Sequence, residues 1–290
     1  MTTWTALTTV PGPLAAEALG EALERLTPAP TAVGVFEVED GSGLWEVGGY
    51  FVAAPDQAGR ALLAKLKGAA PFAVSRLDDR DWVAQVRREL APVVAGRFVV
   101  HGAHDAHRLP GHRIALEIEA AMAFGTGHHA TTRGCLLALD ALIGSGVVAR
   151  NTADIGSGTG ALAMAARAVW RRAVIAADID PIAVATSRAN LRANGFGAGV
   201  PVVRAAGFAA PVLRRRGPYD LIFANILAGP LRRLALAMVR HAAPGGHIIL
   251  SGLLDRQALQ VRAVYAGHGF HPVRHHALDG WTTLTLRRAG

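Results

Sequence analysis

The chain has a single cysteine, Cys135, and lacks long apolar runs. One cysteine can form neither an internal disulfide nor a cysteine-based metal site. The longest apolar stretches, such as Ala161–Ala166, are too short to span a bilayer. The first residues, Met1–Trp4, have neither the charged segment nor the following apolar segment of a signal peptide. We therefore expect a cytoplasmic protein that makes no membrane contact.

Acidic residues are fewer than basic ones, 22 against 30, which leaves a formal net charge of +8 that comes mostly from arginine. A basic surface favours RNA as a neighbour, although an arginine-rich composition alone explains the same count. The charges are dispersed, with Arg214–Arg216 as the longest arginine run, and no basic stretch is interleaved with aromatic residues. The sequence therefore predicts at most a weak contact with RNA or an RNA-rich particle.

The 290 residues are 51% hydrophobic, enough to bury the core of one large domain or two unequal ones. Residues 1–76 predict a small ferredoxin-like α+β domain, because strands and helices follow the order βαββαβ. Asp56 is the expected N-cap of the second helix. The expected elements are strands over Trp4–Val10, Ala32–Val38, Leu44–Val52 and Phe72–Arg76, and helices over Leu14–Leu26 and Asp56–Lys67.

Residues 77–113 are expected to form a linker. It begins with a short helix over Asp81–Leu90 that Pro92 stops, and then becomes irregular. Its histidines suggest a metal site, but Gly and Pro interrupt them, only Asp105 adds a carboxylate, and no helix fixes a ligand pair. We therefore expect no metal there. The histidines are His101, His104, His107 and His112.

Residues 114–290 alternate short apolar strands with helices, which predicts an α/β doubly wound, Rossmann-like parallel sheet with helices on both faces. Asp279-Gly280 between two β-prone runs predicts a terminal antiparallel hairpin. The expected strands are Asn151–Ile155, Ala173–Ala177, Val200–Arg204, Tyr219–Ala224, His247–Leu250, Pro272–Leu278 and Trp281–Arg287, and the expected helices are Arg133–Leu142, Ala161–Val169, Pro181–Asn194, Pro230–Ala242 and Gln257–Ala266.

A glycine loop, Asp154-Ile-Gly156-Ser-Gly158-Thr-Gly160, follows the first of these strands and opens a helix. Glycines let the backbone turn sharply and let a ligand approach it. The spacing differs from the Gly-x-Gly-x-x-Gly of dinucleotide folds. The carboxylate of Asp154 would repel a pyrophosphate, but it suits the cationic amino acid end of S-adenosylmethionine.

The motif Asp178-Ile179-Asp180-Pro181 ends the next strand, and Asp178 lies 22 residues beyond Gly156. An acid at this distance accepts hydrogen bonds from a ribose diol, so Asp178 and the adjacent Ile179 are candidate cofactor contacts. Asp180 is the expected cap of the following helix. A strand-turn-helix without any ligand, or an NAD site, are the alternatives.

Phe124-Gly-Thr-Gly-His-His-Ala-Thr131-Thr132 lies just before the sheet. Its glycines predict a flap in which Phe124 covers the ligand, and either threonine can cap the next helix and offer its hydroxyl to a carboxylate. The two histidines are expected to face solvent rather than to act in catalysis. Cys135 is expected in the core.

Asn225 follows a further strand, at the carboxyl end where ligands bind in a doubly wound sheet. Its side-chain oxygen can accept a hydrogen bond from an amine and so direct the nitrogen lone pair at the sulfonium methyl. Asn225 is thus the candidate catalytic residue. A simple helix cap is the alternative.

Four motifs together resemble the ribosomal protein L11 methyltransferase family of class I methyltransferases: Phe124–Thr132, the glycine loop after Asp154, Asp178–Pro181 and Asn225-Ile-Leu-Ala228. With Leu250-Ser-Gly-Leu253 and Trp281, the resemblance covers nearly the whole chain. The resemblance implies an S-adenosylmethionine-dependent protein-lysine methyltransferase. It would modify lysine and N-terminal amines of ribosomal protein L11, free or on the large subunit, with the N-terminal domain gripping the substrate. Carried over by motif, Thr132, Gly156, Asp178 and Asn225 contact the cofactor or the methyl-transfer zone.

Three rival functions remain open from the sequence. Similar enzymes methylate lysines of the electron-transfer flavoprotein β subunit, but these tend to lack a full N-terminal domain. An RNA or small-molecule methyltransferase is the second rival, and the missing Asn/Asp-Pro-Pro-aromatic motif weighs against it. The third is a non-catalytic, cofactor-binding assembly factor.

Overall fold

The structure is a computed structural model that describes residues 3–30, 32–37, 43–77, 92–109, 111–118 and 130–290. The chain divides into two compact units, Met1–Val86 and Arg87–Gly290. Each unit has its own hydrophobic core, and each is described by itself.

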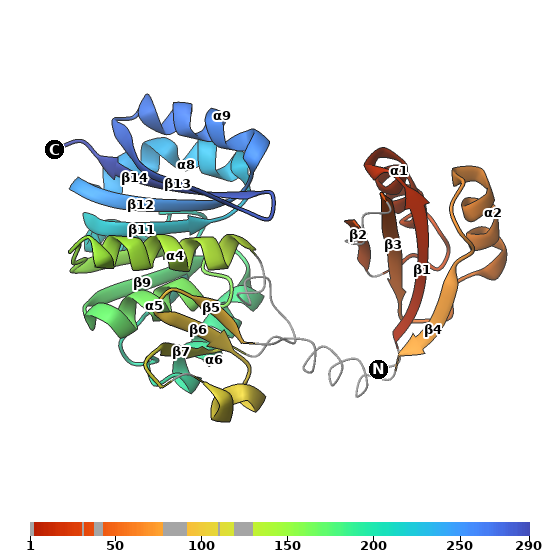
Figure 1. The fold of residues 1–290 in the computed structure, drawn as a ribbon, viewed down its shortest axis with the longest axis horizontal. Coiled ribbons are helices and arrows are strands. Elements are labelled where there is room, and N and C mark those ends of the chain that lie inside the picture. The colour runs from red at the N-terminus through yellow and green to blue at the C-terminus, as the bar shows by residue number, and fades with distance from the viewer. Residues whose placement is uncertain (1–2, 31, 38–42, 78–91, 110, 119–129) are drawn as a thin grey trace. The chain divides into compact units, whose positions relative to one another are not determined.

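The first unit contains a four-stranded antiparallel sheet in the order β2-β3-β1-β4, with two helices packed against it (Figure 1). Leu19 and Leu23 of the first helix are fully buried against Val10 and Val47 of the sheet. The predicted order βαββαβ is therefore confirmed. The elements are β1 (Thr3–Pro11), α1 (Pro13–Leu23), β2 (Ala32–Glu37), β3 (Leu44–Phe51), α2 (Gln57–Lys67) and β4 (Ala73–Leu77).

Helix α2 begins where the Asp56 side chain caps its first turn. The Asp56 carboxylate accepts hydrogen bonds from the amides of Ala58 and Gly59 at 3.2 and 2.7 Å, as predicted for an N-cap. The helix ends at Gly68 in the left-handed conformation, which favours glycine.

The second unit is built on a seven-stranded sheet in the order β10-β9-β8-β11-β12-β14-β13. The first five strands are parallel, and β14 lies antiparallel between β12 and β13. Positive φ angles at Asp279 (50°) and Gly280 (76°) form the hairpin turn that the sequence predicted. The strands are β8 (Asn151–Ile155), β9 (Ala173–Asp178), β10 (Val202–Arg204), β11 (Tyr219–Asn225), β12 (Ala242–Leu254), β13 (Phe270–Leu278) and β14 (Trp281–Arg288).

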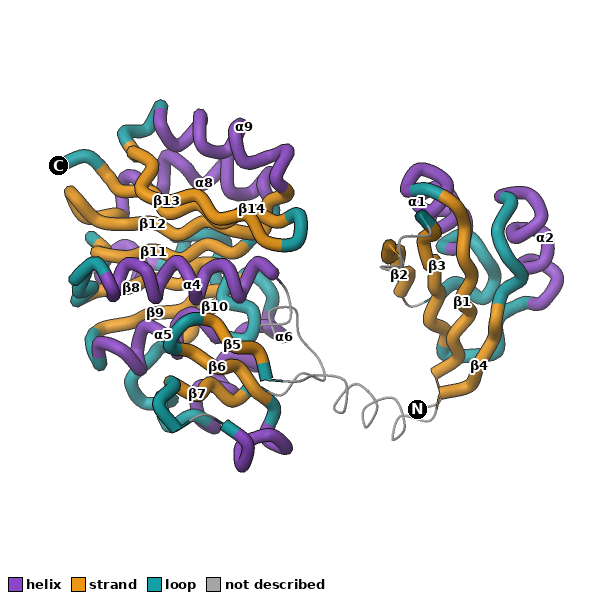
Figure 2. The backbone as a smooth tube through the Cα atoms, in the orientation of Figure 1, coloured by secondary structure: helices purple, strands orange, loops and turns teal. Residues whose placement is uncertain are grey.

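Helices cover both faces of this sheet, as predicted (Figure 2). One face packs against α4 (Ala130–Gly144), α5 (Ala161–Trp170) and α6 (Pro181–Ala193), and the other against α7 (Pro211–Arg216), α8 (Ala228–His241) and α9 (Asp255–Ala266). The short helix α7 was not predicted. None of the described helices is long and apolar enough to cross a membrane.

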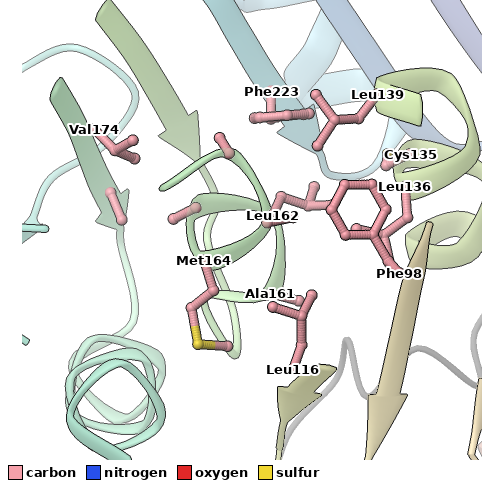
Figure 3. Close-up of a cluster of buried hydrophobic side chains, with 14 of the residues drawn as sticks. Phe98, Leu116, Cys135, Leu136, Leu139, Ala161, Leu162, Met164, Val174 and Phe223 are labelled. Carbon is pink, nitrogen blue, oxygen red and sulfur yellow. The ribbon is translucent and has the colours of Figure 1, made fainter. Parts of the chain in front are cut away.

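The linker prediction is wrong from Val93 onward. A three-stranded sheet of β5 (Val93–Ala95), β6 (Phe98–His101) and β7 (Ile114–Glu117), with the 3-10 helix η1 (Ala103–Arg108), lies within the second unit. Phe98 and Leu116 are fully buried in the same cluster as Leu136 and Leu162 (Figure 3). These short apolar runs are strands because they bury their side chains against α4 and α5. The predicted helix over 81–90 lies outside the described residues.

Candidate cofactor-binding site

The glycine loop leaves β8 at the carboxyl edge of the sheet. Gly156, Gly158 and Gly160 have φ angles of 80°, 52° and 82°, in the region that favours glycine. A Cβ atom on Gly156 would lie 2.3 Å from Cγ2 of Ile226, so a larger residue there requires the Ile226 side chain to move. The Gly156 and Ser157 amides donate to the carbonyl of Ala177 at 2.8 and 3.0 Å, which fixes the turn against β9.

Two polar side chains of α6 hold this loop from behind. The Ser187 hydroxyl donates to the carbonyl of Gly158 at 2.9 Å and lies 3.1 Å from the Ser157 hydroxyl. The Asn190 amide donates to the carbonyl of Thr159 at 2.9 Å. Both side chains are buried. The sequence analysis missed them, and the available signal was two small polar residues spaced i, i+3 on the inner face of a helix.

The Asp178 carboxylate lies at the end of β9, beside the glycine loop. Oδ2 accepts from the amide of Gly158 at 2.9 Å, and Oδ1 accepts from the amide of Asp180 at 3.0 Å. Each oxygen retains a further lone pair for a ligand hydroxyl. Ile179, next in the chain, is 66% exposed and offers an apolar surface at the same edge. Asp180 caps α6 through the amide of Ile182 at 2.9 Å, as predicted.

Asp154 lies behind the loop and is fully buried. Oδ2 accepts from the amide of Ala163 at 3.0 Å, whereas Oδ1 has no hydrogen-bond partner among the described residues. Burial raises the pKa of this carboxyl, the hydrogen bond from Ala163 lowers it and the charge of Asp178 raises it, and together they bring the pKa to about 7. With no exposed surface, Asp154 can influence a ligand through its charge or through a bridging group.

The raised pKa of Asp154 predicts a pH-dependent stability. The native protein keeps this proton up to about pH 7, whereas the unfolded chain loses it near pH 3.8. The free energy of unfolding should therefore fall as the pH rises between these values, by up to about 1.4 kcal/mol per unit, and this contribution should be constant above them. Asp154→Asn removes it.

Urea unfolding of the two proteins at several pH values between 5 and 8 checks this expectation. The stability of Asp154→Asn relative to the unsubstituted protein should rise with pH up to about 7 and then level off. Asp279→Asn, in the exposed hairpin turn, is the matched control and should show no such trend. A parallel pH dependence in Asp154→Asn and the unsubstituted protein contradicts the assignment.

Asn225 ends β11 and faces the start of α4. Its Nδ2 donates to the hydroxyls of Thr131 and Thr132, at 3.3 Å each. The prediction that one of these threonines caps the helix is wrong, because α4 already begins at Ala130 and both lie in its first turn. Their buried hydroxyls orient the Asn225 amide instead. Oδ1 of Asn225 has no hydrogen bond within the ranges that the structure describes.

The loop after Asn225 packs between the bulge in β12 and the glycine loop after β8. The amide of Ile226 donates to the carbonyl of Ser251 at 3.2 Å. A Cβ on Gly252, which has φ 80°, would lie 2.5 Å from the carbonyl oxygen of Ile226. Because Ile226 also contacts Gly156, the loops after β8 and β11 and the bulge in β12 form one packed unit.

The structure therefore brings most predicted site residues to one edge of the sheet: Thr131, Thr132, Asp154, Gly156, Gly158, Gly160, Asp178, Ile179 and Asn225. Phe124 and the two motif histidines lie outside the described residues. Cys135 is buried, as predicted, and burial raises the pKa of its thiol, so it is not a nucleophile here. In the described part of the chain, no group of three or more His, Cys, Asp or Glu side chains could hold a metal ion.

A family model and two relatives with known names place the chain in the same family. The family model described as ribosomal protein L11 methyltransferase (PrmA) matches residues 38–289. A protein of that name from Bradyrhizobium diazoefficiens is 50% identical over 263 residues, covering 89% of this chain and 88% of its own. One from Rhodopseudomonas palustris is 48% identical over 261 residues, with 89% and 88% covered.

Among solved structures, a ribosomal protein L11 methylase from Lactobacillus delbrueckii subsp. bulgaricus matches with a TM-score of 0.62 and 22% identity. The match covers 69% of this chain and all of that one. At this identity the likeness concerns the fold.

Proposed function

The chain belongs to the ribosomal protein L11 methyltransferase family, and we propose that it transfers methyl groups from S-adenosylmethionine to lysine side-chain and N-terminal amines of ribosomal protein L11. The observation that carries this proposal is the meeting of a glycine loop, Asp178 and the Thr-anchored Asn225 at one edge of the sheet.

The residues present fit S-adenosylmethionine. Positive φ angles at Gly156 and Gly158 give a loop surface without side chains, on which a ligand can approach the backbone closely. Asp178 has acceptor capacity for a ribose diol, and exposed Ile179 can pack against an adenine ring. Asp154, with its unpartnered buried oxygen, would be stabilised in its ionised form by a nearby cation.

When bound, S-adenosylmethionine supplies an electrophilic methyl group on a sulfonium. Asn225 is the residue that acts on the acceptor: its Nδ2 is held by Thr131 and Thr132, so Oδ1 can accept a hydrogen bond from the incoming amine. Accepting one N–H of the amine directs the nitrogen lone pair away from Oδ1 and toward the reacting centre.

A free lysine has a pKa of about 10.4, so roughly one in a thousand is neutral at pH 7.4. A partly dry pocket beside a cation lowers the pKa of the amine, through desolvation and like charge. Orientation and electrostatics then carry most of the rate enhancement, and a dedicated general base is not required.

We further propose that the ferredoxin-like domain, residues 1–76, grips the substrate. Its separate core supports an independent recognition role, because the cofactor residues all lie in the second unit. Whether free L11 or L11 on the large subunit is preferred, and whether ribosomal RNA is touched, depends on surfaces outside the cofactor site. A ribosomal substrate implies the cytoplasm as the place of action.

A labelled methyl-transfer assay with several acceptors tests the proposed substrate. Free L11, intact large subunits, the electron-transfer flavoprotein β subunit and naked ribosomal RNA are each incubated with enzyme and labelled cofactor, and the products are mapped by mass spectrometry. We expect label on L11 amines. Label on the flavoprotein subunit or on RNA but not on L11 would refute the substrate assignment, and no label anywhere would refute the activity.

A further inference from the structure

The positive charge of this chain is concentrated in its C-terminal part. Residues 130–290 contain 19 arginines and no lysine, against seven aspartates and no glutamate, which leaves an excess of 12 positive charges. Residues 1–129 contain 11 basic and 15 acidic residues, an excess of four negative charges. An arginine-rich composition alone would raise the net charge of both parts of the chain, so the difference in charge between them needs a local explanation.

Many of these arginines gather where the parallel strands begin, at the opposite edge of the sheet from the cofactor residues. We call this set the basic edge. Its members precede β8, β9, β11 and β12 or end the antiparallel β14, and all are exposed. The starts of β11 and β12 and the end of β14 lie at the end of the second unit where C is marked (Figure 1). They are Arg150, Arg172, Arg214, Arg215, Arg240 and Arg287.

Contacts between the strand starts place these segments side by side. The amide of Ala173 donates to the carbonyl of Arg150 at 3.2 Å, and the side chain of Asn151 donates to the carbonyl of Arg216 at 2.6 Å. Tyr219 pairs with Ala242, the residue after the last turn of α8, and His247 pairs with Arg287. The basic edge is therefore a continuous row across β9, β8, β11, β12 and β14.

Carboxylates do not neutralise this row. Asp220 accepts from the backbone amides of Arg150 and Asn151, at 2.8 and 3.0 Å, and Asp140 pairs with Arg97. No ion pair joins an arginine of the basic edge to a carboxylate in the described ranges. Arginines in the last turns of α7 and α8 also stabilise helix carboxyl termini, but Arg150, Arg172 and Arg287 lie outside helices.

We propose that the basic edge binds the phosphate backbone of RNA. Neighbouring strands lie about 4.8 Å apart, so the row presents a series of guanidinium groups to a ligand with many closely spaced charges. Guanidinium binds phosphate through paired hydrogen bonds and keeps its charge. A single small anion would use only part of such a row. Contacts of this kind carry affinity without sequence specificity.

The placement of the basic edge adds to the proposed methyltransferase activity. The cofactor residues lie at the carboxyl ends of the strands and the basic edge at their amino ends, so RNA bound there leaves the reaction site open. An enzyme held on RNA in this way could reach a protein acceptor on an RNA-rich particle.

Fluorescence anisotropy with a labelled RNA duplex, at increasing salt, tests the proposal. The variant R150E/R172E/R215E reverses three charges of the basic edge. The control R256E/R262E/R274E reverses three exposed arginines on α9 and β13 and changes the net charge equally. We expect the unsubstituted protein and the control to bind RNA with a steep salt dependence, and the edge variant to bind at least about tenfold more weakly.

Equal weakening in both variants would overturn the proposal, because it would show a response to net charge alone. Absence of RNA binding in the unsubstituted protein would also overturn it, as would edge-dependent binding to anionic lipid vesicles without binding to RNA. The milder R150Q/R172Q/R215Q variant, with thermal unfolding and methylation of free L11 as checks, separates loss of binding from loss of fold.

Discussion

Replacing Asn225 by alanine is expected to lower turnover by two to three orders of magnitude, about the cost of removing one pre-oriented hydrogen-bonding group from a reaction site. Affinity for S-adenosylmethionine should change little, since the glycine loop and Asp178 remain. The reason is geometric: Thr131 and Thr132 hold the Asn225 amide, and alanine leaves the acceptor amine without a partner that fixes its lone pair. Calorimetry of cofactor binding and a single-turnover methyl-transfer assay measure the two effects.

Thr131→Val combined with Thr132→Val is the companion variant. It keeps the Asn225 side chain but removes the hydroxyls that hold it. We expect an intermediate loss of turnover, with a smaller effect on the Michaelis constant than on kcat. Normal turnover in Asn225→Ala would show that amine orientation comes from elsewhere, and loss of cofactor binding in that variant would reassign Asn225 to the cofactor.

Replacing Asp178 by alanine is expected to weaken cofactor binding by about two orders of magnitude, from two charge-assisted hydrogen bonds to a ribose worth about 1.5 kcal/mol each. The loop loses a further contact, because the amide of Gly158 donates to the same carboxylate. Titration calorimetry with S-adenosylmethionine and with its demethylated product should report the same loss. An unchanged dissociation constant would contradict the assignment.

Asp180→Ala provides a matched control for this experiment. It removes a carboxylate from the same turn, two residues away, that caps α6 through Ile182 rather than facing the loop. We expect a stability loss of about 1 kcal/mol, typical of a lost N-cap, and a much smaller change in cofactor affinity. Equal effects of the two substitutions on affinity would attribute the loss to the turn as a whole.

The sequence predicted correctly those elements that are determined by residues close to one another in the chain. The strand over Asn151–Ile155, the cap at Asp56 and the hairpin turn at Asp279 are as expected, because each depends on residues close in sequence. The prediction errors arise where an element depends on contacts with residues far along the chain. Phe98 was assigned to a linker, and the strand that contains Leu116 was not predicted, because the burial of both side chains depends on α4 and α5, which lie far along the chain.

The positions of the two main candidate site residues were predictable, and those of the residues that support them were not. Asp178 and Asn225 directly follow predicted strands and are the last residues of β9 and β11, so their edge of the sheet could be inferred. Ser187 and Asn190 contact the loop only through the packing of α6, and their i, i+3 spacing on one helix face does not by itself show what they contact. The roles of Thr131 and Thr132 depend on where α4 begins, which sequence periodicity locates only to within a few residues.

The interlock of Gly156, Ile226 and Gly252 has a consequence for how this enzyme can vary. Ile226 contacts the glycine loop and directly follows Asn225, so the proposed cofactor loop and the proposed catalytic residue are linked through one side chain. A larger residue at Gly252 would displace the Ile226 backbone, and one at Gly156 would displace the Ile226 side chain. We therefore expect acceptor choice to change more readily through the surfaces of the proposed substrate-binding domain than through substitutions at Gly156 or Gly252.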